Sequence, residues 1–176
     1  TLTSTSTSMP PMHSEILTRE QRNLLPLVGK FKKQFGLVGG TAIALHIGHR
    51  ESVDFDLFSP DEFSNANIRA VFRHAGKTIE VLRADTNQFT FLVDDVHITF
   101  FYYPYPIKYV ESLNTFARIP TLLTLAAMKA FALGRRSKWK DYVDLYYILK
   151  NFYTLNDISI EAEALFAQEF NGKLFR

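Results

Sequence analysis

The chain has 176 residues, of which 47% are hydrophobic and 22% charged, and its formal net charge is +2. This length and composition suit one compact domain, or a core with a small helical addition. The chain has no cysteine, which excludes disulfides and thiolate metal sites. No apolar run is long enough to cross a bilayer and no secretory signal is evident, so we expect no membrane partner and a cytoplasmic location. The charge is too small to indicate a nucleic-acid partner by itself.

The N-terminal part predicts a tail, a helix and then a short strand. Residues 1–13 include TLTSTSTS and a Pro pair, and we assign them to a low-complexity tail or one left from cloning. The apolar stripe of 14–33 predicts a helix that Pro26 kinks or splits. Residues 35–38 predict a strand and 41–48 a short helix.

A second group of elements follows the apolar strand that carries Asp54 and Asp56. The run Ser59-Pro60-Asp61-Glu62 predicts the start of a helix, because Pro suits its first position and acids suit its positive end. Turn residues separate three further strands, which we expect to form an antiparallel meander over 78–83, 88–93 and 96–102.

The C-terminal part predicts mainly helices. Residues 108–119 are expected to be irregular or a strand, and helices are predicted over 120–133, 140–151 and 158–170. In the second of these helices we expect four side chains to pack inward: Tyr142, Leu145, Tyr146 and Leu149.

Two carboxylates stand two positions apart in the segment Asp54-Phe55-Asp56-Leu57. Side chains alternate across a strand, so both carboxylates face one side while Phe55 and Leu57 face a core. Two like charges on one face repel each other unless a cation or a donor lies between them. Mg²⁺ binds through a few carboxylates together with phosphates and waters, so Asp54 and Asp56 are candidate ligands for Mg²⁺ (or Mn²⁺) on a nucleotide. A solvated strand edge is the alternative.

A Gly-Gly-Thr turn precedes this strand. Gly39 and Gly40 let the backbone approach a ligand closely, and N–H groups at the following helix start can hold a phosphate. Thr41 adds a hydroxyl there. A simple structural turn is the alternative.

The ordered string GGTAIALHIGHRESVDFDLFS resembles the signature of the nucleotidyltransferase superfamily (DNA polymerase β-like), and more closely its AbiEii/AbiGii toxin branch. The resemblance covers roughly residues 24–150. It implies a metal-dependent nucleotidyltransferase that moves NMP from an NTP to a hydroxyl of RNA, tRNA or a protein. It also implies the toxin of a toxin–antitoxin system, with an antitoxin protein as partner.

The resemblance also marks residues of the loop before the Asp strand. Arg50 and Ser52 are candidates for binding the nucleotide, where the planar fork of Arg50 would hold phosphate. The alternative for Arg50 is an ion pair with Glu51, Asp54 or Asp56.

One position departs from the family pattern. The superfamily usually carries a third metal-binding carboxylate on the strand beside the Asp-x-Asp strand, and Thr99 stands in that slot. Glu80 on a neighbouring strand could supply the missing charge, and His97 could assist proton removal. If neither does, the chain would be a catalytically inactive module that binds a nucleotide or a partner.

In the C-terminal helices the family pattern continues as Lys129, Arg135, Lys140-Asp141 and Asp144-Leu145. By this resemblance Lys129 would neutralise the triphosphate or orient the incoming group, and Asp141 would position Lys129 or a hydroxyl nucleophile. The alternatives are that Lys129 only extends to water and that Asp141 and Asp144 pair with Arg135 or Lys138.

The basic run from Arg135 to Lys140 includes Trp139, and could hold an RNA backbone and stack a base, or be a solvated loop. Taken together, we expect an α/β fold with a small mixed sheet flanked by helices. The nucleotidyltransferase-like core would span 14–107, and a helical region over 108–176 would close the cleft.

Overall fold

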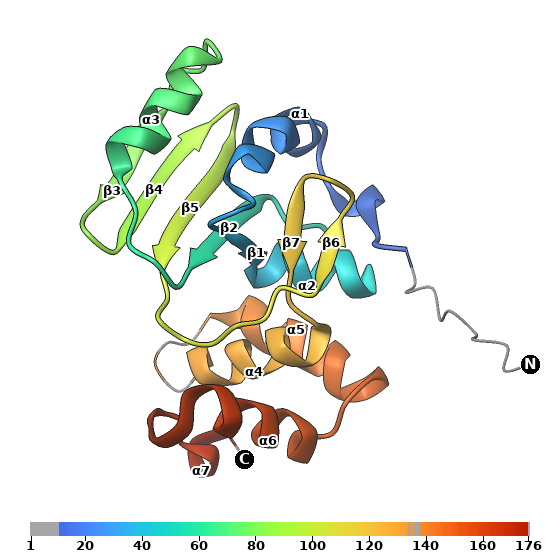
Figure 1. The fold of residues 1–176 in the computed structure, drawn as a ribbon. Helices are drawn as coiled ribbons and strands as arrows, with labels where there is room; N and C mark the ends of the chain where they lie inside the picture. The colour runs from blue at the N-terminus through green and yellow to red at the C-terminus, as the bar shows by residue number, and fades with distance from the viewer. Residues whose placement is uncertain (1–10, 134, 136–137, 176) are drawn as a thin grey trace, which may run out of the picture.

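A five-stranded mixed sheet forms the centre of the computed structural model, which describes residues 11–133, 135 and 138–175 (Figure 1). Its strands are β1 (Gly36–Val38), β2 (Asp54–Ser59), β3 (Glu80–Ala84), β4 (Gln88–Val93) and β5 (Val96–Tyr102). Their order in space is β1-β2-β5-β4-β3. β2 runs parallel to β5, whereas β1 is antiparallel to β2 and the meander β3-β4-β5 is antiparallel throughout. The predicted mixed sheet and meander are confirmed.

Phenylalanines fill one face of this sheet. Because side chains alternate along each strand, β2 buries Phe55 and Leu57, and β4 and β5 bury Phe91 and Phe100. The ring of Phe72 from the helix α3 (Asn65–His74) packs edge-on to Phe91 at 5.0 Å. The predicted alternation is therefore confirmed, and the opposite face of β2 and β5 is left to carry polar side chains.

The N-terminal segment is shorter in helix than predicted. A 3-10 turn (Ser14–Ile16) precedes α1 (Arg19–Val28), and a second 3-10 turn (Gly29–Phe31) follows it. The segment 14–33 is therefore split, as predicted, although the breaks are 3-10 turns at both ends of α1 and Pro26 itself lies within the helix. Residues 1–10 of the predicted tail lie outside the described residues, and the amide of His13 already donates to the carbonyl of Leu45.

The predicted start of α3 at Ser59 was also wrong. Ser59 ends β2, and its hydroxyl makes hydrogen bonds with the main-chain amide and carbonyl of Asp61, which forms a local turn. The helix begins at Asn65, where the Ser64 hydroxyl accepts a hydrogen bond from the Asn67 amide. Ser59 and Ser64 could each cap a helix, but Ser59 belongs to β2, so the helix starts after Ser64.

The helix α2 (Gly39–Ile47) joins the sheet to a C-terminal helical layer, because it follows β1 directly and packs against α4 (Leu122–Leu133) and α5 (Trp139–Asn151) (Figure 1). The layer also contains α6 (Leu155–Phe166), a 3-10 turn (Ala167–Glu169) and α7 (Gly172–Phe175). Residues 108–119 hold the hairpin of β6 (Glu111–Leu113) and β7 (Ala117–Ile119), with β7 beside β1. The domain boundary at residue 107 stays a prediction.

The helix α5 is rotated relative to its predicted orientation. Leu145 is buried as expected, but Tyr142 and Tyr146 are exposed, and the buried side instead includes Asp141, Asp144 and Ile148. Within the residues that the structure describes, no helix is both long and apolar enough to span a membrane.

Candidate active site

The polar face of the sheet brings Asp54 and Asp56 together with residues of β5. In the parallel register, Asp54 pairs with His97 and Asp56 with Thr99, so the four side chains share one face. Nδ1 of His97 lies 3.7 Å from Oδ1 of Asp54, and the Asp54 side chain is 47% exposed. The two carboxylates are therefore adjacent on an accessible face.

Thr99 occupies the position predicted for a third carboxylate, directly beside Asp56. Its hydroxyl lies 3.2 Å from the hydroxyl of Thr90 on β4. Glu80 cannot supply the missing charge, because it lies on β3, three strands away from β2. At about 4.8 Å per strand, its backbone is roughly 14 Å from that of Asp54. The placement of Glu80 on a neighbouring strand was wrong.

The glycine pair closes over this face. Gly39 has φ of +74°, and a Cβ at this residue would lie 2.2 Å from Oδ2 of Asp56. A Cβ on Gly40 would lie 2.4 Å from Nη2 of Arg50. The absence of side chains thus lets the start of α2 contact both a carboxylate and a guanidinium. Val38 precedes α2 and has no polar side chain to cap its first amides, which leaves an N-terminus suited to an anion.

Thr41 and Ser52 make hydrogen bonds that stabilise this turn. Both are buried, and their hydroxyls are 2.9 Å apart. The Thr41 hydroxyl also makes a hydrogen bond with the main-chain carbonyl of Asp54. The two residues therefore fix the start of β2 relative to α2, and their predicted contact with a nucleotide stays a prediction.

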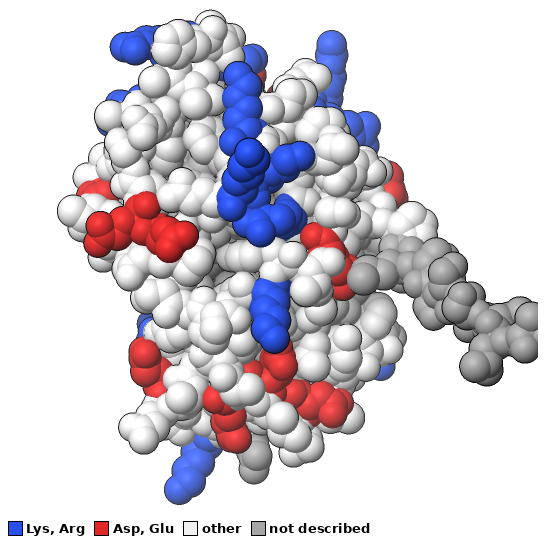
Figure 2. All heavy atoms as spheres, in the orientation of Figure 1, with Lys and Arg blue, Asp and Glu red and all other residues white. Residues whose placement is uncertain are grey.

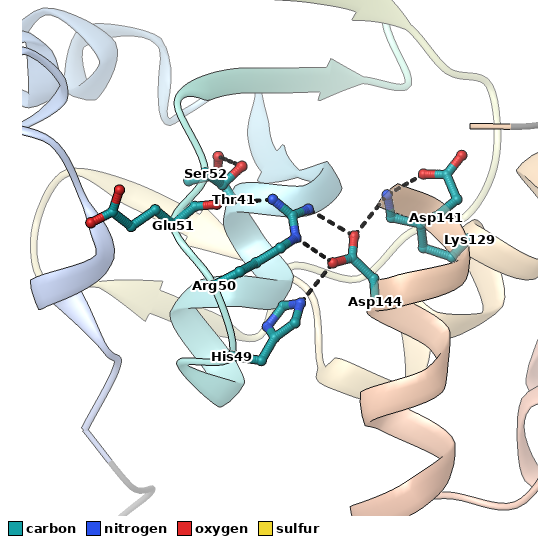
Figure 3. Close-up of polar contacts among 8 residues, drawn as sticks. All are labelled: Thr41, His49, Arg50, Glu51, Ser52, Lys129, Asp141 and Asp144. Carbon is teal, nitrogen blue, oxygen red and sulfur yellow. Dashed lines mark hydrogen bonds and ion pairs between the residues drawn. The ribbon is translucent and has the colours of Figure 1, made fainter. Parts of the chain in front are cut away.

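Arg50 is held by Asp144, which is not among the partners predicted for it (Figure 3). Nε and Nη2 of Arg50 donate to the two Asp144 oxygens at 2.8 and 3.0 Å, which is a bidentate pair. Of the partners predicted for Arg50, Glu51 accepts a hydrogen bond through its main-chain carbonyl.

Lys129 completes a buried network around Asp144. Its amine lies 3.1 Å from Oδ2 of Asp144 and donates to Oδ1 of Asp141, and Nε2 of His49 lies 2.7 Å from Oδ1 of Asp144 (Figure 3). The predicted pairing of Asp141 with Lys129 is therefore present. Asp144 pairs with His49, Arg50 and Lys129 instead of the alternative partners Arg135 and Lys138.

The charges of this network are balanced. Burial alone would raise the pKa of Asp144, but hydrogen bonds from His49 and Arg50 and the nearby Lys129 charge hold it well below its usual range. Two basic and two acidic side chains thus lie together at the junction of α2, α4 and α5. Neither Lys129 nor Asp144 needs water to stabilise its charge.

The donor set of the polar face fits Mg²⁺. Mg²⁺ in nucleotide sites is commonly bound by one or two carboxylates, with phosphate oxygens and waters completing the octahedron. Asp54 and Asp56 supply two carboxylates as oxygen ligands on one accessible face, beside a turn that can hold phosphate. Among the described residues, no group of three or more His, Asp or Glu side chains is arranged to hold a metal ion.

The structure thus links the predicted site residues through contacts rather than leaving them scattered. Asp56 lies against Gly39, Gly40 lies against Arg50, and Asp144 joins Arg50 to Lys129. His49 and Asp144 were missed as parts of this unit. The adjacency of His49 to Arg50 and of Asp144 to Leu145 in the quoted motifs was the available signal.

Three other basic groups, Arg135, Lys32 and Arg118, have structural partners. Arg135 pairs with Glu169 and lies over the Phe131 ring, whereas Arg136 and Ser137 of the predicted basic cluster lie outside the described residues. Figure 2 shows Lys and Arg side chains gathered near β7, where a surface cavity of about 430 Å³ is lined by Lys32, Lys33 and Arg118. There, Lys32 and Arg118 donate to main-chain carbonyls, so these two groups stabilise the loops.

Comparison with known proteins gives a family and a fold. The model of the family described as "Nucleotidyl transferase AbiEii toxin, Type IV TA system" matches residues 27–174. An uncharacterized protein of Aquifex aeolicus (strain VF5) is 31% identical over 140 residues, which cover 76% of this chain and 68% of that protein.

Two solved structures share the fold at low sequence identity. A Helicobacter pylori protein, described as a candidate nucleotidyltransferase, superposes with a TM-score of 0.61 at 17% identity, covering 89% of this chain and 88% of that one. MenT4, a nucleotidyltransferase toxin of Mycobacterium tuberculosis H37Rv, gives a TM-score of 0.52 at 14% identity, covering 81% and 62%.

Proposed function

Because this chain belongs to the AbiEii nucleotidyl transferase toxin family, we propose that it transfers NMP from a nucleoside triphosphate to a hydroxyl of RNA, in a reaction that needs Mg²⁺ or Mn²⁺. The observation that carries the proposal is the contact of Gly39 with the Asp56 carboxylate. It places a phosphate-binding turn against a pair of candidate metal ligands. A protein hydroxyl is the other acceptor that the chemistry allows.

Each element of the site has a role in this reaction. Asp54 and Asp56 hold the metal, which when bound neutralises charge on the triphosphate and on the leaving pyrophosphate. The amides at the start of α2 bind phosphate oxygens. Arg50 lies beside Gly40, so its guanidinium contacts the same phosphates from the side.

Lys129 and Asp141 act through Asp144 in this proposal. Asp144 fixes the plane of the Arg50 guanidinium through two hydrogen bonds, and Lys129 holds Asp144 from the opposite side. A charge that is already in position stabilises a transition state without having to move during the reaction. A rigid Arg50 therefore stabilises the transition state more than a mobile one does. The ammonium of Lys129 carries three N–H donors, so it can donate to a phosphate oxygen while it keeps its contacts with Asp141 and Asp144.

Label transfer tests the proposal. The protein is incubated with Mg²⁺, each labelled NTP in turn and total RNA, beside an Asp54→Ala/Asp56→Ala variant. We expect transfer of one or more nucleotides by the wild type, and its loss in the variant. An Asp85→Ala/Asp94→Ala variant removes the same number of carboxylates from exposed turns and should retain activity. Equal transfer by the wild type and the Asp54→Ala/Asp56→Ala variant would reject the site.

Thr99 favours a second candidate, a catalytically inactive module of the same fold that binds a nucleotide or a partner without turnover. A hydroxyl beside Asp56 cannot act as a general base as a carboxylate does. In this case the wild type would bind NTP in a metal-dependent manner that the Asp54→Ala/Asp56→Ala variant loses, yet no label would reach RNA or protein. Calorimetric titration with a non-hydrolysable NTP analogue, in parallel with label transfer, separates the two candidates.

A further inference from the structure

The outer face of α5 carries an unusual set of exposed aromatic side chains. Trp139, Tyr142 and Tyr146 are 69%, 55% and 58% exposed. They stand at positions i, i+3 and i+7 of the helix, so they lie in one row along its axis. Large aromatic side chains are usually at least half covered, and a row of three on one helix face indicates a binding surface.

The exposed charges of this segment are all positive. Between residues 138 and 151 the charged side chains are three lysines and two aspartates. Lys138, Lys140 and Lys150 are exposed, whereas Asp141 and Asp144 are buried on the other side of α5. The amine of Lys150 lies 5.7 Å from the centre of the Tyr146 ring, so charge and aromatic surface are in contact. The surface is therefore complementary to a polyanion that also offers flat apolar rings.

Single-stranded RNA has both properties. Its phosphates pair with lysines, and its bases stack on exposed aromatic rings without a need for a particular sequence. A double-stranded RNA offers phosphates but no free base faces. An acidic protein segment offers charge but no stacking. The row of aromatic rings therefore selects a single strand among the possible anionic partners.

The position of α5 connects this surface to the proposed reaction. The opposite side of the same helix carries Asp144, which holds Arg50 of the site. A helix with its side chains is about 10–12 Å across, so a strand on Tyr146 lies roughly that far from the buried network. We infer that the outer face of α5, formed by Trp139, Tyr142, Tyr146 and Lys150, binds a single-stranded segment of the RNA acceptor. This inference rests on the proposed function for the identity of the acceptor.

Trp139 provides the test, because it is the single tryptophan of the chain. A short oligouridylate is titrated into the protein without NTP or metal, and tryptophan fluorescence is followed at several salt concentrations. Stacking should quench the fluorescence, and the affinity should fall as salt rises. The Asp54→Ala/Asp56→Ala variant should bind equally well, so failure of the catalytic proposal would leave this result unchanged.

Variants separate stacking from charge. Tyr146→Leu should weaken binding at least about fivefold, whereas Phe152→Leu, a control that is also half-exposed, should have no effect. Lys150→Gln should reduce the slope of log affinity against log salt by about 0.7, and the distant Lys30→Gln should not. Circular dichroism of each variant verifies that the helix content is unchanged.

Three outcomes would overturn the inference. The first is no quenching of Trp139 by oligouridylate at low salt. The second is equal quenching by polyglutamate, which would show that the lysines recognise negative charge alone, as for an acidic protein partner. The third is equal affinity of the wild type and Tyr146→Leu, which would show that the exposed rings do not contact the bases.

Discussion

The buried network predicts that Asp144→Asn strongly destabilises the protein. Asp144 is fully buried, and its two oxygens bind His49, Arg50 and Lys129. Asn keeps the shape but removes the charge, and its amide would place a donor against another donor. Removal of one partner from a buried ion pair costs about 3–5 kcal/mol, because the remaining charges are uncompensated. For a chain of this size, that corresponds to a fall in Tm of roughly 6–20 °C.

Urea unfolding at several pH values measures this effect. The pKa of Asp144 is lower in the folded protein than its ordinary value of 3.8, so the folded state binds fewer protons there than the unfolded state. The stabilisation is therefore fully present above the ordinary pKa and is lost as pH falls toward the folded-state pKa. The difference between wild type and Asp144→Asn should be largest near pH 7 and shrink below about pH 4.

Asp94→Asn is the matched control. Asp94 pairs with Lys77 at the surface, where both side chains are about one-third exposed, and Asn tolerates its left-handed backbone. We expect its free energy of unfolding to change by less than about 1 kcal/mol. If Asp144→Asn cost no more than Asp94→Asn, the reasoning that Asp144 holds the junction of α2, α4 and α5 would be refuted.

Three further changes test the site itself. Gly39→Ala places a Cβ 2.2 Å from Oδ2 of Asp56, and the resulting shift of the carboxylate should lower the label-transfer rate by about 100-fold; an unchanged rate would contradict the role of the turn. Thr41→Val removes a buried hydroxyl that binds the carbonyl of Asp54, and denaturant unfolding should show a loss of about 1–3 kcal/mol. Thr99→Asp adds a third carboxylate beside Asp56, so Mg²⁺ should raise the Tm of this variant more than that of the wild type; equal shifts would place the metal elsewhere.

Much of the fold was predictable because it rests on local patterns. The alternation of Asp54, Phe55, Asp56 and Leu57 fixes the two faces of β2 whatever lies around it. Turn residues separate the strands of the meander in the same local manner. The resemblance to the toxin branch then supplied the family, which the family model confirms.

The orientation of α5 was not predictable from periodicity. Tyr142, Leu145, Tyr146 and Leu149 form a regular apolar stripe, and so an ordinary amphipathic helix would bury it. The structure instead buries a stripe that includes Asp141 and Asp144. The burial of these two acids depends on the cations Arg50 and Lys129, which lie in other segments of the chain, the loop before β2 and the helix α4. A rule that places charges in water fails wherever partners from distant segments neutralise them.

Arg50 and Asp144 are separated by 94 positions in the chain, and this separation has a consequence for the order of events during synthesis. A ribosome adds about 5–20 residues per second, so roughly 5–19 s pass between the addition of Arg50 and that of Asp144. Over that interval the glycine turn and the Asp strand are already made, while Arg50 still lacks the Asp144 carboxylate that holds it. The nascent chain therefore cannot assemble the network around Arg50 until α5 has emerged, when most of the described protein has been made.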